Sequence, residues 1–290
     1  MSLLSKVKEN EVLNEYGSEY KSFLEDSKDN VVISPSGLRS FISNRGEWYN
    51  NTILREKTFN GNVASTIGSL LHQYAEDYYN KELNQDNTML DWKIKQIAKN
   101  YPEAISEFER VYPIFKSSYL DISNKPDYIE QYLEYDLTKN IKLAGSFDFL
   151  IKEDNEYIIG DYKSSARSFK DIESYILQLS VYSLLVELVL GFKIDKVRVV
   201  GIITTKEPKI IVVDDKPNVE FVKNLLNDVV YSIQLVRDNP DLKSIIFPFN
   251  YYDMFNSGED KERLGSKEPK IKELDKTTLV REKLKRNVFG

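Results

Sequence analysis

The chain has 290 residues, 41% of them hydrophobic, which is enough to bury a sizeable core in one elaborated domain or two closely packed ones. Its net charge of -6 excludes a surface coated in basic residues, although a local basic strip could still bind phosphates. No apolar run approaches the roughly 20 residues that span a bilayer, and residues 1–6 contain no signal-peptide core. We therefore expect a cytoplasmic protein with no membrane partner.

The N-terminal part of the chain, residues 1–120, is expected to be mainly helical. Residues 11–28 and 87–112 show the periodicity of helices that would wall one side of a site. The segment 121–258 would form the core that carries the chemistry, and residues 259–290 would form a charged C-terminal tail.

A further helix in the N-terminal part carries His72, the only histidine of the chain. Ser65 is a candidate cap for this helix, which would run to about Tyr79. Gly68 lies one turn before His72 on the same face, where another backbone segment can approach closely. A lone histidine is more often a core or surface residue than a ligand, so His72 by itself predicts no site. Glu76, one turn beyond it, suits either a second metal or a solvated helix face.

Two runs rich in β-branched and aromatic residues predict an antiparallel hairpin. They are residues 141–152 and 156–164, joined by a short polar turn. Asp148 and Asp161 would therefore lie on neighbouring strands. The apolar residues before both aspartates indicate strands that form core, where charges are costly unless they are paired or bound to metal.

The hairpin could bring two carboxylates and an ammonium group together. Because side chains on a strand alternate, Asp161 and Lys163 would share a face while Tyr162 points the other way and leaves its carbonyl available. Asp148 joins them if the register turns it to that face. Hard divalent cations prefer carboxylate oxygens, and a nearby lysine can orient a nucleophile or stabilise charge on a phosphate. By itself, an Asp-x-Lys pattern is most often a solvated strand end.

The next segment, residues 169–191, predicts a largely buried helix because apolar residues cover most of its circumference. Gln178 and Tyr182 lie four residues apart, and so on one face. Polar groups on a buried helix need partners, which a metal-site lysine, its water or a nucleotide would supply. The alternative is a core glutamine bonded to backbone.

The remaining segments complete an α/β fold with a mixed central sheet flanked by helices. Residues 129–137 predict a strand that leads into the hairpin, and residues 196–205 and 209–213 predict two later strands. Residues 219–237 predict a helix. The succession of strands, helix, strands and helix favours a sheet covered by helices.

Four short motifs occur in the order that is typical of the RecB-type branch of the PD-(D/E)XK nuclease superfamily. Each motif is weak alone, but the ordered set with suitable secondary structure is specific. The chain resembles this branch over residues 34–182, and the resemblance implies a restriction-endonuclease-like core with a helical N-terminal elaboration. The matching segments are the lead-in at 34–41, Gly68 to His72, Gly145 to Asp148, Asp161 to Lys163, and Gln178 to Tyr182.

The resemblance also implies a role for each matching residue. Lys163 would act on the attacking water, and Gln178 and Tyr182 would support the lysine and the substrate. A neutral imidazole is a somewhat softer ligand than a carboxylate, and it suits Mn²⁺ as well as Mg²⁺. The groups that would bind this catalytic metal are His72, Asp148, Asp161 and the carbonyl of Tyr162.

Several relatives in this branch hold an iron–sulfur cluster with four cysteines, whereas this chain has none. Asn44 and Arg45 stand where a Cys-Pro pair would be expected. No cluster with cysteine ligands can form, so packing must supply the stability that the cluster gives elsewhere. Trp48, Tyr49 and the aromatic segment 247–252 are candidates for this packing, with stacking on unpaired bases as the alternative.

The expected activity is Mg²⁺- or Mn²⁺-dependent hydrolysis of DNA, by an exonuclease of replication, repair or recombination rather than by a restriction enzyme. The alternatives are a structure-specific endonuclease, a non-catalytic DNA-binding protein that retained the fold, and cleavage of RNA. No Walker-type phosphate loop occurs, so a helicase or recombination partner would be a separate polypeptide, in a bacterial cell or a phage-infected host. Besides Lys163, the candidate contacts to single- or double-stranded DNA ends are Arg39, Arg45, Arg167 and Lys170.

Overall fold

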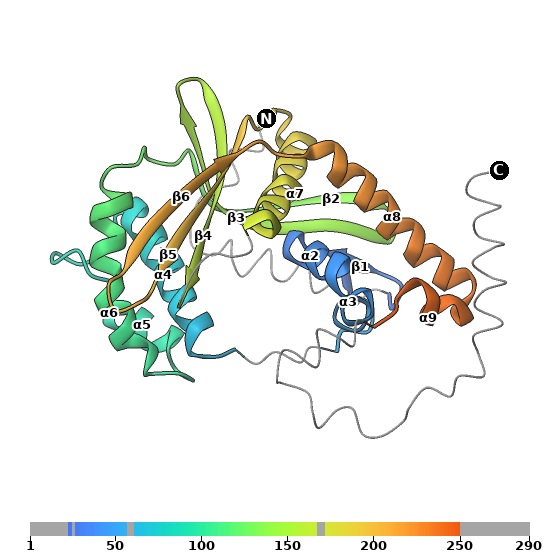
Figure 1. Cartoon of the computed structure of the whole chain (residues 1–290), viewed down its shortest axis with the longest axis horizontal. Helices are drawn as coiled ribbons and strands as arrows, with labels where there is room; N and C mark the ends of the chain where they lie inside the picture. The colour runs from blue at the N-terminus through green and yellow to red at the C-terminus, as the bar shows by residue number, and fades with distance from the viewer. Residues whose placement is uncertain (1–22, 25–26, 57–60, 167–171, 250–290) are drawn as a thin grey trace.

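The computed structural model describes residues 23–24, 27–56, 61–166 and 172–249 (Figure 1). Its centre is a six-stranded sheet in the order β1-β3-β4-β5-β6, with β2 paired to β3. The β1–β3 and β4–β5 pairs are parallel and the others are antiparallel, so the predicted mixed sheet is confirmed. The strands are β1 (Val31–Ile33), β2 (Tyr128–Thr138), β3 (Ile141–Glu153), β4 (Glu156–Ser165), β5 (Lys196–Ile203) and β6 (Lys209–Asp215).

Helices cover both faces of the sheet, as Figure 1 shows. One core lies between the sheet and the helices α2, α7 and α8, and includes Leu38, Leu185 and Val229. A second core lies between the opposite face and the helices α4 and α6, and includes Leu70 and Phe108. The helices are α2 (Pro35–Ser43), α3 (Arg45–Thr52), α4 (Val63–Asn80), α5 (Asp91–Ile97), α6 (Ala104–Phe115), α7 (Ile172–Leu190), α8 (Val219–Asp238) and α9 (Lys243–Ile246), with η2 (Lys116–Leu120) and η3 (Pro240–Leu242).

The predicted hairpin is confirmed as β3 and β4, in a register that pairs Phe149 with Gly160 and Ile151 with Ile158. The ring of Phe149 lies over Gly160 so closely that a Cβ there would come within 1.9 Å of its Cζ atom. Only glycine therefore fits this position of β4. The ladder between the two strands ends at this pair, just before Asp148 and Asp161.

The helix that carries His72 is confirmed as α4, but its cap differs from the expectation. Asn62 is the N-cap, and its side-chain oxygen accepts from Ser65 N–H at 2.8 Å. Ser65 Oγ in turn accepts from Asn62 N–H at 2.9 Å. Ser65 therefore occupies the third helical position of a reciprocal capping box rather than the cap itself.

The expectation of one continuous helix over residues 87–112 is wrong. The structure has two helices there, α5 and α6, with a turn between them that contains Tyr101 and Pro102. A residue before proline is sterically disfavoured in the helical region, so Tyr101 is a natural break point. The predicted helix at 11–28 lies largely outside the described residues, as does the predicted charged tail at 259–290.

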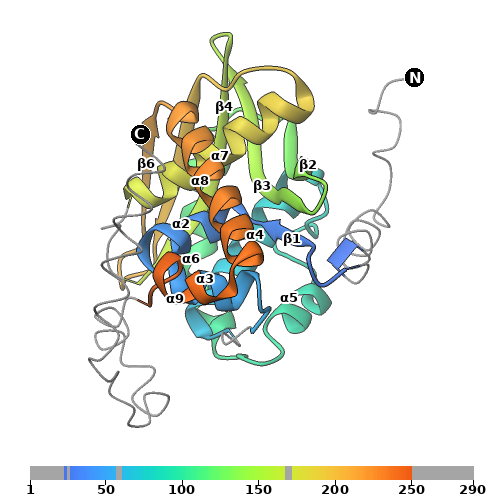
Figure 2. The same ribbon diagram turned by 90° about the vertical axis from the view of Figure 1, so that its right-hand side faces the viewer.

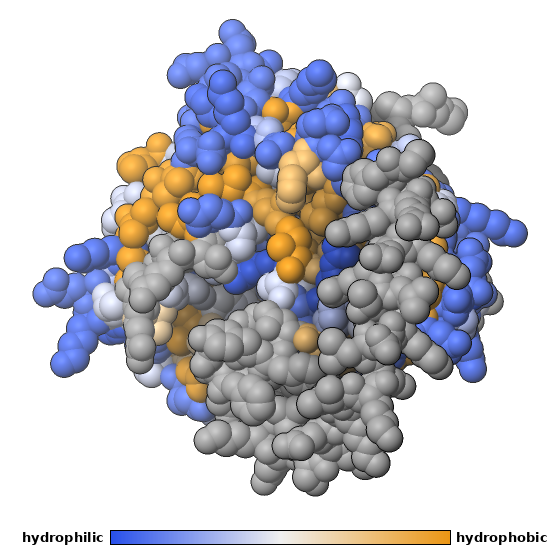
Figure 3. Space-filling model, turned by 45° about the vertical axis from the view of Figure 1, so that its right-hand side comes forward, coloured by the Kyte–Doolittle hydropathy of each residue, from blue (hydrophilic) through white to orange (hydrophobic). Residues whose placement is uncertain are grey.

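Helix α7 is more apolar than the sequence analysis allowed. An 18-residue window of this 19-residue helix has a mean hydropathy of 1.4, so the helix is long and apolar enough to cross a membrane. The segment Gln178 to Val186 is buried throughout, and Figure 2 shows α7 and α8 side by side over the sheet. The central helix of a folded core passes the same test, so this is weak support for a membrane span. On the face drawn in Figure 3, hydrophobic residues gather toward the upper left and the centre, with hydrophilic residues around them.

The aromatic packing expected in place of a metal cluster is confirmed for three residues. Phe247 stacks on Trp48, with ring centroids 5.8 Å apart, and lies 4.7 Å from the Tyr49 ring. Trp48 is 1% exposed and so cannot stack on a base. Residues 250–252 of the same aromatic segment lie outside the described residues.

Candidate active site

Strand β3 loses its regular alternation next to Asp148. Phe147 packs in the core beneath α7, whereas Phe149, two residues later, packs in the opposite core beneath α4 and α6. A regular strand would turn both side chains to one face. On β2, Glu130 has φ 46° in the left-handed region, and the β2–β3 pairs on either side of it place it opposite Asp148. Asp148 and Glu130 therefore lie opposite each other at the point where both strands depart from regular sheet geometry.

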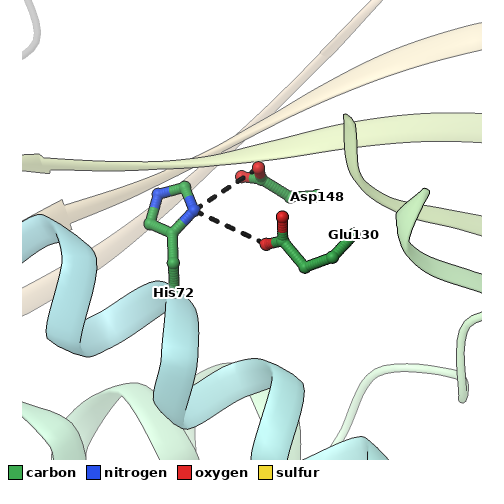
Figure 4. Close-up of side chains that lie close together, drawn as sticks. All are labelled: His72, Glu130 and Asp148. Carbon is green, nitrogen blue, oxygen red and sulfur yellow. Dashed lines mark ion pairs between the residues drawn. The ribbon is translucent and has the colours of Figure 1, made fainter. Parts of the chain in front are cut away.

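His72 on α4 faces these two carboxylates (Figure 4). Its Nδ1 atom lies 3.4 Å from Asp148 Oδ1 and 3.8 Å from Glu130 Oε1. One potential ligand atom from each of the three residues lies within 4.8 Å of the other two. The other ring nitrogen of His72, Nε2, lies 2.7 Å from the carbonyl oxygen of Tyr162. Because a carbonyl only accepts, Nε2 carries a proton and Nδ1 is the atom presented to the carboxylates.

This group of three needs positive charge. Burial by itself would lower the pKa of His72, but the neighbouring Asp148 and Glu130 carboxylates raise that pKa well above its usual value. Burial opposes ionisation of Asp148, but His72 and then Lys163 pull the pKa of Asp148 below its usual range. Burial raises the pKa of Glu130. A proton on Nδ1 or a cation among the three groups satisfies the same electrostatic demand.

Asp161 and Lys163 form a second cluster beside the first. Lys163 Nζ lies 2.7 Å from Asp161 Oδ2, and Gln178 Nε2 on α7 donates to Asp161 Oδ1 at 3.3 Å. Asp161 is 3% exposed, and burial together with Asp148 raises its pKa to about 7. Tyr162 N–H donates to Asp148 Oδ2 at 2.5 Å. The carboxylate of Asp148 therefore replaces the backbone carbonyl that would accept this hydrogen bond in a regular sheet. Asp161 and Lys163 therefore lie together as predicted, and the charge of Asp148 raises the pKa of both, although Asp161 is not among the three residues that converge at His72.

Two glycines of the motifs are needed because neighbouring groups press against them. A Cβ at Gly145 would lie 2.8 Å from Pro35 Cδ and 3.1 Å from the Tyr182 hydroxyl. This close approach is what places Tyr182 against β3. A Cβ at Gly68 would lie 3.1 Å from Ser164 Oγ, so the close approach expected there comes from a side chain of β4.

A cleft of about 560 Å³ opens between α4 and the strands β2 and β4. It brings His72, Glu130 and Lys163 onto one accessible surface, and Glu76 lines the same space. The side chains of His72, Glu130 and Lys163 are each about one-quarter exposed, so a substrate can reach them. The lining residues are Ser65, Gly68, Ser69, His72, Gln73, Glu76, Glu130, Tyr162, Lys163 and Ser164.

The four residues predicted to contact DNA differ in their surroundings. Arg39 on α2 lies with its Cζ atom 5.4 Å from the ring centroid of Tyr175 on α7. Arg45 pairs with Asp228 on α8 at 2.6 Å. Arg167 and Lys170 lie outside the described residues. The contribution of all four to DNA binding therefore stays a prediction.

Glu130 is the site residue that the sequence analysis missed. Its strand was predicted, but an acidic residue in a polar, half-buried strand is unremarkable without its cross-strand neighbour. Only the register of β2 on β3 shows that Glu130 faces Asp148. The charged residues along β2 are a local signal of a functional strand face, but they do not distinguish Glu130 from Glu134, which lies four residues later on the same strand.

The comparison with protein families agrees with this architecture. The family model of the PD-(D/E)XK nuclease superfamily matches residues 32–244. A solved structure of a candidate exonuclease from Eubacterium rectale is 17% identical, covers 77% of this chain and 83% of its own, and has a TM-score of 0.48. The structure of SSO0001 is 15% identical, covers 57% and 74%, and has a TM-score of 0.30. No curated protein matches significantly. Because the family match covers well over half of the chain, this protein belongs to the PD-(D/E)XK nuclease superfamily.

Proposed function

We propose that this protein is a Mg²⁺- or Mn²⁺-dependent deoxyribonuclease that removes nucleotides from DNA ends. Membership of the superfamily supports hydrolysis of nucleic acid. The observation that carries the metal dependence is the convergence of His72, Glu130 and Asp148, whose potential ligand atoms lie within 4.8 Å of one another beside the Asp161–Lys163 pair.

The donor set fits a divalent cation. His72 Nδ1 and one oxygen each from Asp148 and Glu130 would hold it, since two carboxylates and an imidazole suit Mg²⁺ or Mn²⁺. Such a cation supplies an activated water and neutralises charge on the phosphate. Tyr162 orients the imidazole through its carbonyl, as ligand histidines commonly require. Asp161 remains a further ligand that the sequence predicts, whereas the carbonyl of Tyr162, the other predicted ligand, binds His72 Nε2 on the side of the ring away from Nδ1.

The protein groups around that position divide the remaining work. Lys163 is positioned to orient the attacking water or to donate to the phosphate oxygens. Asp161 holds the ammonium group at 2.7 Å, and Gln178 holds Asp161 in turn. Asp161 therefore fixes the lysine whether or not it also binds metal. The low exposure of both aspartates strengthens these charge interactions relative to water.

Action at ends, the DNA substrate and a role in replication, repair or recombination have weaker support than hydrolysis itself. They rest on the resemblance to the RecB-type branch, from which a separate helicase or recombination partner and a cytoplasmic location are also proposed. Hydrolysis of a phosphodiester does not by itself distinguish DNA from RNA, so RNA is a substrate to be tested.

The test uses end-labelled linear single- and double-stranded DNA, a closed circle and a matched RNA, each with Mg²⁺, Mn²⁺ or chelator. The account expects metal-dependent loss of linear DNA while circles stay intact, and no cleavage by Asp161→Asn. Nicked circles would establish an endonuclease instead. Equal cleavage by the wild type and the Asp161→Asn variant would refute the proposed site.

A further inference from the structure

Tyr175 contacts two cations beside the proposed site. It lies in the first turns of α7, and its ring centroid is 5.5 Å from Lys163 Nζ and 5.4 Å from Arg39 Cζ. A cation within about 6 Å of an aromatic face is attracted by the ring quadrupole. The ring therefore joins three elements, α2, β4 and α7, at the lysine on which the proposed chemistry depends.

Tyr175 also extends the polar stripe of α7. Tyr175, Gln178 and Tyr182 are spaced by three and four residues, which places them on one face of the helix. Gln178 binds Asp161, and Tyr175 contacts Lys163. One face of α7 thus touches both members of the Asp161–Lys163 pair, and the family motif accounts only for the later two residues of the stripe.

We propose that Tyr175 is the positioning residue that fixes Lys163 toward the scissile phosphate and holds Arg39 beside it to bind a neighbouring phosphate of the same strand. The inference rests on the proposed nuclease function and deepens it. A lysine ammonium on a flexible four-carbon stem is only partly fixed by one ion pair, so the ring supplies a second, directional contact.

The substrate class follows from charge. Two cations held at one ring repel each other, and an anion that contacts both relieves this repulsion. A phosphodiester backbone supplies anions at regular spacing, and arginine matches phosphate oxygens with its planar fork. Lys163 lines the cleft, and all three side chains are half-buried rather than fully enclosed, so both cations are accessible to a substrate strand that extends past Lys163.

The first test compares Tyr175→Leu with Tyr175→Phe in steady-state cleavage of single-stranded DNA. We expect Tyr175→Leu to lower kcat/KM about tenfold, the equivalent of about 1.4 kcal/mol in the barrier. Phenylalanine keeps the aromatic face and should recover most of that loss. Thermal melting of each variant checks that the fold is intact.

The chain offers a matched control at another ring. Lys152 Nζ lies 5.0 Å from the ring centroid of Tyr157, and this ring also packs on Phe192. Tyr157 lies at the turn end of the hairpin, away from the site. Tyr157→Leu should therefore lower the melting temperature without changing kcat/KM. A merely structural role for Tyr175 would give the same result as this control.

The second test separates the two cations. Arg39→Gln should mainly raise KM and weaken the salt dependence of binding, since it removes one phosphate contact. Combined with Tyr175→Leu, it should cost less than the product of the two single losses, because both remove the same ring contact.

Several results would overturn the inference. They are wild-type kinetics for Tyr175→Leu, a phenylalanine variant as impaired as the leucine variant, or fully multiplicative losses in the double variant. If the wild type cleaves no nucleic acid with any metal, the proposed function fails and the inference fails with it. If the wild type cleaves and only the Tyr175 results disagree, the inference alone is wrong.

Discussion

The two ends of the β3–β4 hairpin both carry carboxylates, but they differ in burial and in the kind of cation that faces them. At the turn, Arg198 donates to Glu153 at 3.0 Å through each of two nitrogens and pairs with Asp214 at 2.7 Å. Lys196 pairs with Glu156. At the other end, three carboxylates share one lysine and one histidine whose charge depends on protonation.

The difference separates a structural cluster from a functional one. The turn end sets its carboxylates against two permanent cations, and its residues are partly exposed, so the pairs stabilise the hairpin modestly. The site end buries Asp148 and Asp161 beside a single permanent cation, Lys163, and a histidine that is charged only when protonated. This arrangement costs stability and suits a bound cation. Mutations at the site end should therefore lower activity with little loss of stability, whereas mutations at the turn end should lower stability and leave activity unchanged.

The largest expected effect is that of Lys163→Ala. It removes the ammonium group from the site end, and we expect the single-turnover cleavage rate to fall by about 10³-fold. Lys196→Ala at the turn is the matched control and should cleave at the wild-type rate. Comparable rates for the wild type and Lys163→Ala would remove the basis for assigning catalysis to this end.

Glu130→Gln should act on metal use. The substitution keeps the shape of the side chain but removes one proposed ligand charge, so the Mn²⁺ concentration for half-maximal cleavage should rise about 10- to 100-fold. Glu153→Gln at the turn should leave that concentration unchanged. If both variants respond alike, Glu130 is not part of the metal site.

Arg198→Met should show the reverse pattern. It leaves Glu153 and Asp214 without their shared cation, so the free energy of unfolding in urea should fall by about 1–3 kcal/mol. Cleavage at saturating metal should remain normal. A loss of activity without a loss of stability would contradict the division between the two ends.

Asp161→Asn should abolish cleavage yet stabilise the metal-free protein at alkaline pH. The pKa of Asp161 is raised to about 7 in the folded state, so this group contributes stability that is lost as pH rises through that value. At pH 8 the variant should exceed the wild type by about 1 kcal/mol or more, and the difference should vanish below the unfolded pKa of about 4. Melting curves across this range check the sign. A variant less stable than the wild type at pH 8 would show that Asp161 is fully compensated by Lys163.

Local pattern in the sequence was enough to predict much of this hairpin and its chemistry. Strand alternation placed Asp161 with Lys163, and their 2.7 Å contact is observed. Helical spacing placed Gln178 on the face of the helix that turns to the site, although its partner there is Asp161 rather than the expected lysine. These relations hold within one element or across a tight turn, where periodicity fixes geometry.

Other features depend on contacts that local pattern does not contain. The irregularity at Asp148 and the position of Glu130 require the register of β2 on β3, which is set by packing across the whole sheet. Asn62 is a residue type that favours a helix cap, but residue type alone does not distinguish it from Ser65. Pro102 favours a break at Tyr101, but the apolar periodicity of the segment continues across it.

The most direct test of the central claim is calorimetric titration of Mn²⁺ into the wild type, Asp148→Asn and Glu153→Gln. Melting curves first confirm that all three proteins are folded. The account predicts saturable binding by the wild type and by Glu153→Gln with equal affinity, and loss of that binding in Asp148→Asn. Wild-type affinity in Asp148→Asn, or no binding by the wild type, would contradict it.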